Sequence, residues 1–288
     1  MAGGLGTRLH PLTLGVNKQL LPIYDKPMVY FPIATLMTAG IREILIIANP
    51  GDLDTFIRLL GDGSQLGVKF SYKPQHVPRG IAEAFLVGEE FIGEENVALI
   101  LGDNVFYGSG LGRHLETYTT FTGANVFAYR VSNPSDYGII NFDENLKILS
   151  IEEKPQKPKS NFAIPGLYFF DATVKDVVKS VRESSRGELE IVSLLKEYLD
   201  MGKLSVTVLP RGTAWLDTGS VQALNDAGNF VRIIEERQGY KIACLEEISW
   251  RMGWITDSDL SQIASRHTST AYGEYLRNLI DQSIGKEW

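Results

Sequence analysis

The run ILIIA at residues 44–48 decides the fold, because it is continuously apolar and rich in β-branched side chains. Such a run is typical of a parallel strand that is covered on both faces. A second run of this kind, VALIL, follows at residues 97–101. Between them, residues 81–91 have the pattern of a helix that begins after the turn at 78–80. Strand, helix and strand in this order predict an α/β fold built on a doubly wound, mostly parallel, Rossmann-like sheet.

The pattern changes after Gly123, where strands follow one another with less helix between them. This change predicts a mixed-sheet part, followed by helices at the C-terminus. Ser220 is a plausible N-cap and Gly239 a stop for a helix over residues 221–238. Strands are expected at residues 126–131, 138–142, 146–151, 166–170 and 204–209, and further helices at 173–181, 189–199 and 257–284. We divide the chain into one domain, residues 1–240 with parts 1–123 and 124–240, and a helical appendage, residues 241–288.

Charge and hydropathy exclude several classes of function. The 288 residues include 28 Lys and Arg against 35 Asp and Glu, a net charge of −7, and the cations are not clustered. A nucleic-acid partner is therefore not expected, because binding the many phosphates of a nucleic-acid backbone needs clustered cations. The most apolar window, residues 27–41, is too short to span a bilayer and contains two prolines, so we predict a buried helix and no membrane partner.

The cysteine and histidine residues bear on the cellular compartment and on metal binding. Cys244 is the single cysteine, which excludes an intrachain disulfide and fits a reducing compartment, so we expect a cytoplasmic protein. Its thiol is expected in the core. The four histidines lie far apart in the chain and lack the spacing of a zinc site.

The segment AGGLGTRL at residues 2–9 carries the first chemical signal. Gly3, Gly4 and Gly6 would let the backbone approach a triphosphate closely, and Arg8 adds a permanent cation with a fork matched to phosphate. The spacing is not that of a Walker A loop, and Leu9 stands where the dinucleotide fingerprint has its third glycine. An ordinary glycine-rich turn is an equally good interpretation of this segment on its own.

Three more residues are candidates for binding the phosphates or a metal ion next to this loop. Lys18, in NKQLLP at residues 17–22, is interpreted as a second cation for the same phosphates, against the alternative of a solvated loop lysine. Asp103 follows the second apolar run in LGDN, and Asp217 lies in WLDTG. Carboxylates at strand ends are the hard ligands that Mg2+ takes together with substrate phosphates. A helix cap or turn is the competing interpretation for each aspartate.

Together these motifs resemble the sugar nucleotidyltransferases. The glycine-rich loop ending in Thr-Arg, KQLLP, LGDN, EEKP at residues 152–155 and WLDTG occur in the family's order, and the resemblance covers nearly the whole chain. It is closest to the members that act on dTTP and glucose 1-phosphate. It implies that glucose 1-phosphate attacks the α-phosphorus of dTTP in line, giving dTDP-glucose and pyrophosphate. This is the first step of dTDP-rhamnose synthesis, with Mg2+ as cofactor.

The resemblance also implies residue roles. Residues 1–123 would bind the nucleotide, and residues 124–240 the sugar phosphate. A glutamine amide offers both the donor and the acceptor that the imide edge of thymine requires. The implied roles are nucleotide contact for Gly3, Gly4, Gly6 and Thr7, catalysis for Arg8 and Lys18, base recognition for Gln75 and Gly80, sugar-phosphate contact for Tyr137, Gly138, Glu153, Lys154 and Ile164, and Mg2+ ligation for Asp103 and Asp217. Composition alone favours a solvated charged loop for residues 152–159.

Assembly and regulation come only from the resemblance. It implies a homotetramer with a second nucleotide-sugar site near a subunit interface. The residues that match this second site are Tyr107, Gly108, Arg211, Glu247, Ile248 and Arg251.

The sequence departs from the family pattern at its start, where the family has a short apolar strand leading into the glycine loop. Here Met1 stands directly before Ala2. We expect an apolar run upstream of Met1 in the natural protein, and an open slot between two parallel strands beside Gly3. A smaller departure is Asn17, where the family commonly has serine.

Two alternatives remain open at this stage. A UTP–glucose-1-phosphate uridylyltransferase would use the same chemistry, and one methyl group in a pocket discriminates only about 10-fold. A truncated homologue that binds nucleotide sugars without turnover is the second alternative. A dehydrogenase is disfavoured, because the dinucleotide fingerprint is absent.

Overall fold

The computed structural model describes residues 1–118, 120–184 and 186–281. Its first half alternates strands and helices: α1 Tyr30–Thr38, β3 Glu43–Ala48, α2 Leu53–Leu60, β4 Lys69–Pro74, α3 Glu83–Val87, α4 Glu89–Ile92 and β5 Val97–Ile100. β3 and β4 are parallel, with Glu43 opposite Lys69. The strands predicted from the two apolar runs are confirmed, and the helix expected over residues 27–41 is α1. The single helix expected over 81–91 is wrong, because Gly88 ends α3 and a second short helix follows.

Met1 and Ala2 lie between β3 and β5 and pair with both. The Ala2 N–H donates to the Ile47 carbonyl at 2.6 Å, and Ala2 forms a parallel bridge with Ala48. On the other side, the Met1 nitrogen donates to the Ile100 carbonyl at 2.8 Å, and the Gly102 N–H donates to the Met1 carbonyl at 2.8 Å. These two residues therefore occupy the position of a central parallel strand.

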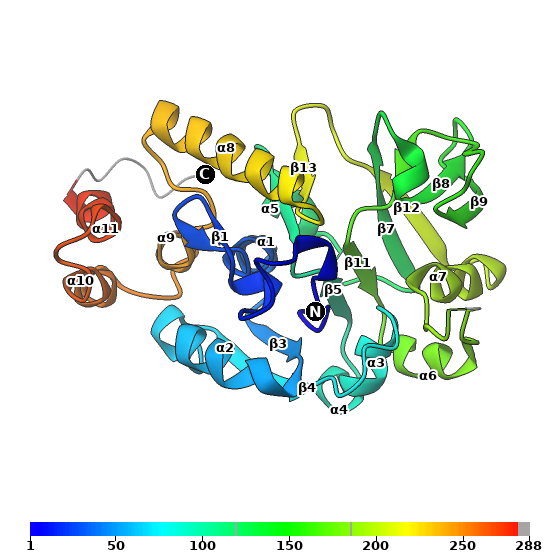
Figure 1. The fold of residues 1–288 in the computed structure, drawn as a ribbon, viewed down its shortest axis with the longest axis horizontal. Coiled ribbons are helices and arrows are strands. Elements are labelled where there is room, and N and C mark those ends of the chain that lie inside the picture. The colour runs from blue at the N-terminus through cyan, green and yellow to red at the C-terminus, as the bar shows by residue number, and fades with distance from the viewer. Residues whose placement is uncertain (119, 185, 282–288) are drawn as a thin grey trace.

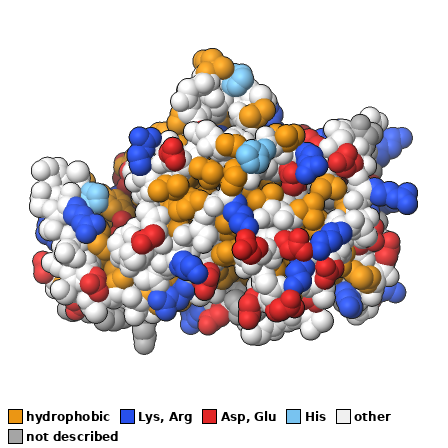
Figure 2. Space-filling model, turned by 90° about the horizontal axis from the view of Figure 1, so that it is seen from below, with side chains coloured by type: hydrophobic (Ala, Val, Ile, Leu, Met, Phe, Trp, Pro, Cys, Tyr) orange, Lys and Arg blue, Asp and Glu red, His pale blue; other side chains and the backbone are white. Residues whose placement is uncertain are grey.

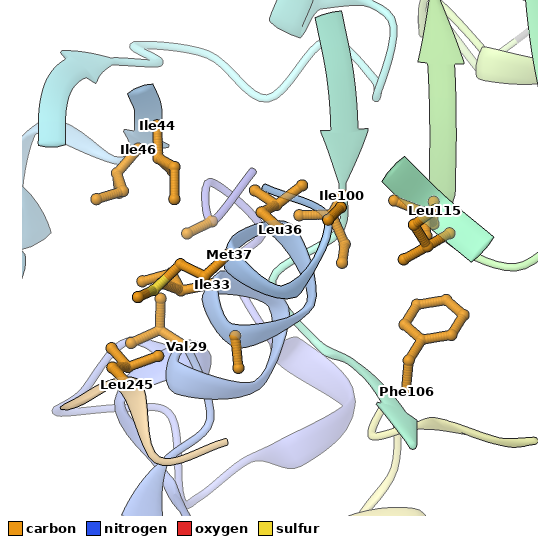
Figure 3. Packing of buried hydrophobic residues seen from close by; sticks show 14 of the residues in the cluster. Val29, Ile33, Leu36, Met37, Ile44, Ile46, Ile100, Phe106, Leu115 and Leu245 are labelled. Carbon is orange, nitrogen blue, oxygen red and sulfur yellow. The ribbon is translucent and has the colours of Figure 1, made fainter. Parts of the chain in front are cut away.

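A cavity of about 330 Å3 separates the rest of β3 from the rest of β5. Its lining is mainly apolar and includes Leu36 of α1, Ile44 and Ile46 of β3, and Ile100 of β5. Figure 3 shows Ile44 and Ile46 on one side of α1 and Ile100 on the other. A slot between two strands was expected beside Gly3; the cavity lies between β3 and β5 and is lined by Met1 and Ala2.

The second half forms the mixed sheet that was expected. Its strands are β7 Ala124–Arg130, β8 Gly138–Phe142, β9 Ile148–Glu153, β10 Phe162–Ala163, β11 Leu167–Phe170 and β12 Leu204–Val208. The order is β5-β11-β7-β10-β8-β9, and β12 also pairs with β7. β11 is antiparallel to both β5 and β7, whereas β12 is parallel to β7. Parallel pairing therefore predominates in the first part, and antiparallel pairing in the second.

Two short antiparallel pairs and several helices complete the domain. The strand pairs are β1 Pro22–Ile23 with β2 Lys26–Pro27, and β6 Asn104–Tyr107 with β13 Ala214–Asp217. The helices are α5 Leu111–Glu116, α6 Val174–Val177 and α7 Ile191–Asp200. The helix expected over residues 173–181 is thus α6 continued by a 3-10 turn, Val178–Ser180, and that over 189–199 is α7.

The long helix α8, Val221–Gln238, has the predicted bounds. The Ser220 hydroxyl accepts from the Ala223 N–H at 3.1 Å, and Gly239 ends the helix at φ 73°. Three helices follow: α9 Leu245–Arg251, α10 Asp257–Ser265 and α11 Ala271–Asp281. The segment expected to be helical, residues 257–284, contains α10 and α11, and residues 282–284 lie outside the described residues.

Figure 1 shows β8, β9 and α7 at one end of the molecule and α10 and α11 at the other, with the N-terminus between them. Leu245 and Ile248 of α9 join the core cluster that contains Ile33 and Met37 of α1, so the C-terminal helices are anchored to the first half. Cys244 is 1% exposed, which confirms a buried thiol.

The face drawn in Figure 2 carries acidic and basic side chains interspersed with hydrophobic ones. Within residues 1–118, 120–184 and 186–281, no helix is both long and apolar enough to cross a membrane.

Candidate active site

The glycine loop begins where Ala2 leaves the sheet. Gly3 is buried, and a Cβ placed on it would lie 2.0 Å from Oε1 of Gln75, so only glycine fits there. Gly6 has φ 62°, a left-handed conformation that favours glycine, and its carbonyl accepts from the Thr13 hydroxyl at 2.8 Å. A 3-10 turn, Thr7–Leu9, then buries Leu9 and leaves Arg8 exposed. The loop is thus held at both ends and presents its cation outward.

Lys18 lies beneath this loop, in the 3-10 turn Lys18–Leu20. Asn17 ties the turn to the sheet: its amide donates to the Ala2 carbonyl at 3.2 Å, and its Oδ1 accepts from the Gln19 N–H at 2.9 Å. Lys18 is only 6% exposed, and its Nζ lies 2.5 Å from Oδ2 of Asp103. The alternative of a solvated loop lysine is therefore wrong.

Asp103 and Asp217 are brought together by the pairing of β6 with β13. Asn104 lies opposite Asp217 in the register of these strands. The Thr218 N–H and hydroxyl both donate to the Asp103 carbonyl, at 3.1 and 2.8 Å. Two carboxylates far apart in the chain thus lie at adjacent strand ends, as the proposed Mg2+ site requires.

Asp217 is surrounded by charged groups of both signs. Burial raises the pKa of Asp217, the neighbouring Asp103 raises it further, and Lys18 and Arg8 oppose this shift. A Cβ on Gly219 would lie 2.9 Å from Oδ1 of Asp217 and 3.4 Å from Nη2 of Arg8, so the guanidinium is close to the carboxylate. A buried carboxylate beside a second carboxylate is stabilised by a dication.

The donor set fits Mg2+ better than a transition metal. Over the described residues, no group of three His, Cys, Asp or Glu side chains is placed to hold an ion. Mg2+ is commonly bound through one or two carboxylates together with substrate phosphates and water. Asp103 and Asp217 supply that pair of carboxylates, next to the glycine loop.

Gln75 lies against Gly3 of the loop, and Gly80 lies in the turn before α3. Gln75 follows β4, and its N–H donates to the Ala48 carbonyl at 2.8 Å, which extends the parallel pairing. Gly80 has φ 102°, and a Cβ there would lie 2.4 Å from the Leu189 carbonyl oxygen. Residue 80 must therefore be glycine for the 78–80 turn to pack against the segment that leads into α7.

The predicted sugar-phosphate residues converge at the edge of the mixed sheet. Gly138 lies opposite Glu153 in the pairing of β8 with β9, and its carbonyl accepts from the Ile164 N–H at 2.8 Å. The Lys154 N–H donates to the Tyr137 carbonyl at 3.0 Å, and Lys154 has φ 43°. Burial of its side chain raises the pKa of Glu153, while Lys154 opposes this shift.

Tyr137 connects this edge to the two aspartates. Its ring packs against Trp215 with 5.2 Å between ring centroids, and Trp215 lies two residues before Asp217 in β13. Burial raises the pKa of the Tyr137 hydroxyl, and Asp217 adds to this effect. The loop after β9 also has the surface ion pair expected of a solvated segment, Lys159 with Glu152 at 2.9 Å. The interpretation as a solvated charged loop therefore fits Lys159, and the sugar-phosphate role of Glu153 and Lys154 stays a prediction.

The residues assigned to a second site lie in two places. Tyr107 and Gly108 follow β6, where the Tyr107 hydroxyl donates to Gln238 at 3.0 Å, and Arg211 is exposed before β13. Glu247, Ile248 and Arg251 belong to α9, where Arg251 Nε donates to Glu247 Oε1 at 2.8 Å. The Glu247 and Ile248 side chains are buried within the subunit.

Three residues that contact the candidate site residues were missed by sequence reasoning. Asn104 donates to Oδ1 of Asp103 at 2.9 Å and accepts from Trp215 Nε1 at 2.6 Å, so it orients the carboxylate. Thr218 holds the Asp103 backbone, as described above. Glu83 accepts from Gln75. Asn104 and Thr218 adjoin the predicted aspartates, so their neighbourhood was a usable signal, whereas nothing local distinguishes Glu83.

The chain is also similar in sequence to known proteins. The family model described as nucleotidyl transferase matches residues 1–233. A glucose-1-phosphate thymidylyltransferase of Mycolicibacterium smegmatis is 55% identical over 282 residues, covering 98% of this chain and 98% of the relative.

Solved structures are similar as well. A Bacillus anthracis protein, named provisionally as a glucose-1-phosphate thymidylyltransferase and solved in complex with a sucrose, has a TM-score of 0.74 and 36% identity, and the match covers 80% of this chain and 93% of that one. A UDP-glucose pyrophosphorylase complexed with UDP-glucose has a TM-score of 0.70 and 25% identity, with 81% and 97% covered. The chain belongs to the nucleotidyl transferase family.

Proposed function

We propose that this protein transfers dTMP from dTTP to glucose 1-phosphate, giving dTDP-glucose and pyrophosphate. The observation that carries the proposal is the cluster of Arg8, Lys18, Asp103 and Asp217 beside the glycine loop. The relative that is 55% identical over nearly the whole chain is a glucose-1-phosphate thymidylyltransferase, which supports dTTP over UTP. This support comes from the whole sequence, because a pocket distinguishes a methyl group only weakly.

Each part of the site has a task in this reaction. The glycine loop approaches the triphosphate with its backbone N–H groups, and Arg8 holds the phosphates as charge builds on their oxygens. Glu153 and the backbone of Gly138 and Ile164 orient the sugar phosphate for in-line attack on the α-phosphorus. The attacking oxygen belongs to the substrate, so no covalent enzyme intermediate is required.

We propose Mg2+ as the cofactor, held by Asp103 and Asp217. When bound, the ion neutralises negative charge on the reacting phosphates. Lys18 holds Asp103 in place through its ion pair, and Asn104 fixes the other carboxylate oxygen. The protein therefore keeps the Asp103 carboxylate oriented before substrate arrives.

A substrate panel tests the proposal. Pyrophosphate release is measured with dTTP, UTP, ATP and GTP against glucose 1-phosphate and other sugar 1-phosphates. The expected result is the highest kcat/KM with dTTP and glucose 1-phosphate, in the presence of Mg2+. A higher kcat/KM with UTP would indicate the uridylyltransferase instead. Failure to release pyrophosphate in a single turnover, with dTTP bound, would favour the non-catalytic homologue.

We also propose that the protein is a cytoplasmic homotetramer that supplies dTDP-rhamnose synthesis and is inhibited by dTDP-rhamnose. The second site would involve Tyr107, Gly108 and Arg211 together with α9. The single buried cysteine fits a reducing compartment. Light scattering tests the tetramer. Inhibition curves test the regulation, and curves without an effect of dTDP-rhamnose would contradict it.

A further inference from the structure

Gln75 has a buried amide directly against the glycine loop. The residue is 1% exposed, and a Cβ on Gly3 would lie 2.0 Å from its Oε1. Its backbone is fixed by the hydrogen bond to the Ala48 carbonyl. The sheet thus holds the backbone of Gln75, and burial confines its amide, which can present either the oxygen or the nitrogen toward the glycine loop.

Glu83 of α3 settles that choice. The Gln75 Nε2 donates to Oε2 of Glu83 at 2.7 Å. Glu83 is 5% exposed and also accepts from the Arg79 backbone N–H at 3.0 Å and from Arg79 Nε at 2.9 Å. An ionised carboxylate can only accept hydrogen bonds, so the amide must turn its nitrogen toward Glu83.

Glu83 stays ionised at neutral pH. Burial acts to raise its pKa, but the hydrogen bonds from Gln75, from the Arg79 N–H and from the Arg79 guanidinium, together with the charge of that guanidinium, outweigh burial, and the net effect is a lowered pKa. The acceptor character that orients Gln75 is therefore permanent under working conditions.

The opposite end of the amide is left as an unpaired acceptor. Across the described part of the chain, Oε1 of Gln75 is one of four buried side-chain oxygen or nitrogen atoms without a hydrogen-bond partner. Leaving such an atom unpaired costs about 1–3 kcal/mol, so a donor on a bound ligand would satisfy it. The atom faces the glycine loop, where the nucleotide is proposed to bind.

We propose that Glu83 is a positioning residue that fixes Gln75 as a hydrogen-bond acceptor, and that this makes the base pocket select a ring N–H. Thymine and uracil carry that hydrogen on N3, whereas N3 of cytosine has a lone pair that would face Oε1. This inference rests on the proposed function, because it assumes that the pocket beside Gly3 binds the base. It makes Glu83, which need not touch the substrate, a determinant of nucleotide specificity.

Binding of dTTP and dCTP to the whole protein, measured by calorimetry without glucose 1-phosphate, tests the proposal independently of turnover. In Glu83→Met the side chain keeps its size and loses its acceptor, so the amide can rotate. The expected result is a preference for dTTP over dCTP that falls at least about 10-fold. In turnover assays the KM for dTTP should rise, while kcat at saturating dTTP changes less. Glu83→Gln keeps one acceptor oxygen and should restore most of the preference.

Arg79→Met is the matched control. It removes an exposed guanidinium that contacts Glu83 but leaves the Arg79 backbone N–H and Gln75 bound to the carboxylate, so the preference should not change. A folded Glu83→Met protein with the wild-type preference would overturn the proposal.

A second probe needs no variant. The triphosphate of N3-methylthymidine lacks the ring N–H and should bind the unmodified protein at least about 100-fold more weakly than dTTP does, since a site built for a hydrogen bond rejects analogues that lack it. Equal binding would overturn the proposal. If dTTP and dCTP binding differ as expected but pyrophosphate is never released, the proposed function is wrong and the specificity inference stands.

Discussion

The Nζ atom of Lys18 lies 2.5 Å from Oδ2 of Asp103, in an ion pair whose lysine side chain is almost completely buried. The lysine thus neutralises one of the two carboxylates proposed to hold Mg2+, in addition to any contact with phosphate. A buried pair of this kind loses much free energy when one partner is removed, because the remaining charge is left uncompensated. The pair therefore links the glycine-loop side of the site to the metal side.

Lys18→Met is expected to lower kcat on the order of 10²-fold, through loss of a cation near the transition-state charge. The same change should lower the Mg2+ concentration needed for half-maximal activity, because Asp103 no longer shares its charge with an ammonium group. Activity measured as a function of Mg2+ concentration checks both effects, with the exposed Lys69→Met as control. An unchanged Mg2+ dependence would contradict the coupling between Lys18 and the metal site.

Asp217→Asn keeps the shape of the side chain but removes a negative charge from the proposed Mg2+ site. The expected loss in kcat is on the order of 10²-fold or more, and Asp103→Asn should behave alike. Turnover at limiting Mg2+ is the measurement, and Asp226→Asn, an exposed change on α8, is the control. Near-normal turnover of Asp217→Asn under these conditions would show that its assigned role is wrong.

Arg8→Lys is expected to be damaging, although the charge is kept. A point ammonium does not reproduce the two-pronged contact of a guanidinium with phosphate. If Arg8 acts mainly on the transition state, kcat falls more than KM rises. Steady-state kinetics separate the two parameters, and Arg113→Lys on the exposed face of α5 serves as control. A change in KM alone would reduce Arg8 to a ground-state binding residue.

Gly3 and Gly4 should respond differently to alanine. The Gly3→Ala methyl would meet Oε1 of Gln75, so the melting temperature should fall, by an amount equivalent to about 1–3 kcal/mol for overpacking. Nothing lies within 4 Å of a Cβ on Gly4, so Gly4→Ala should melt normally. It should still raise the KM for dTTP, because the methyl group occupies the space that a phosphate needs. Unchanged kinetics in Gly4→Ala would mean that no phosphate approaches the loop there.

Apolar residues added before Met1 are expected to stabilise the protein. A chain with five Val or Ile residues placed ahead of Met1 can fill the cavity of about 330 Å3 between β3 and β5. Burial of each such side chain contributes about 1.5–3 kcal/mol, so the free energy of unfolding should rise by several kcal/mol. Thermal and urea unfolding measure the change, with five Gly and Ser residues as the matched control. Equal stability of the two extended chains would contradict the interpretation of the cavity as a strand position.

The sequence predicted those helices and strands whose bounds are set by residues close together in the chain. The bounds of α8 follow from Ser220, the apolar spacing and Gly239, all within one stretch of chain. The strand β8 was predicted with its observed bounds, Gly138–Phe142, for a similar reason. By contrast, the insertion of β11 between β5 and β7, antiparallel to both, depends on residues more than 40 positions away. The break at Gly88 was also missed, because one glycine in a helical pattern lowers helix stability by only about 1 kcal/mol and does not decide the outcome.

The sequence by itself determined the chemical groups of the site and the family: a glycine loop with Arg8, a lysine in KQLLP, and two aspartates at strand ends. Only the tertiary structure decided how these groups are paired and oriented. It placed Lys18 on Asp103, Asn104 on the other oxygen of that carboxylate, and Glu83 on the amide of Gln75. The physical reason is that the strength of such contacts depends on burial and low local polarity, which exist only after distant segments have packed together.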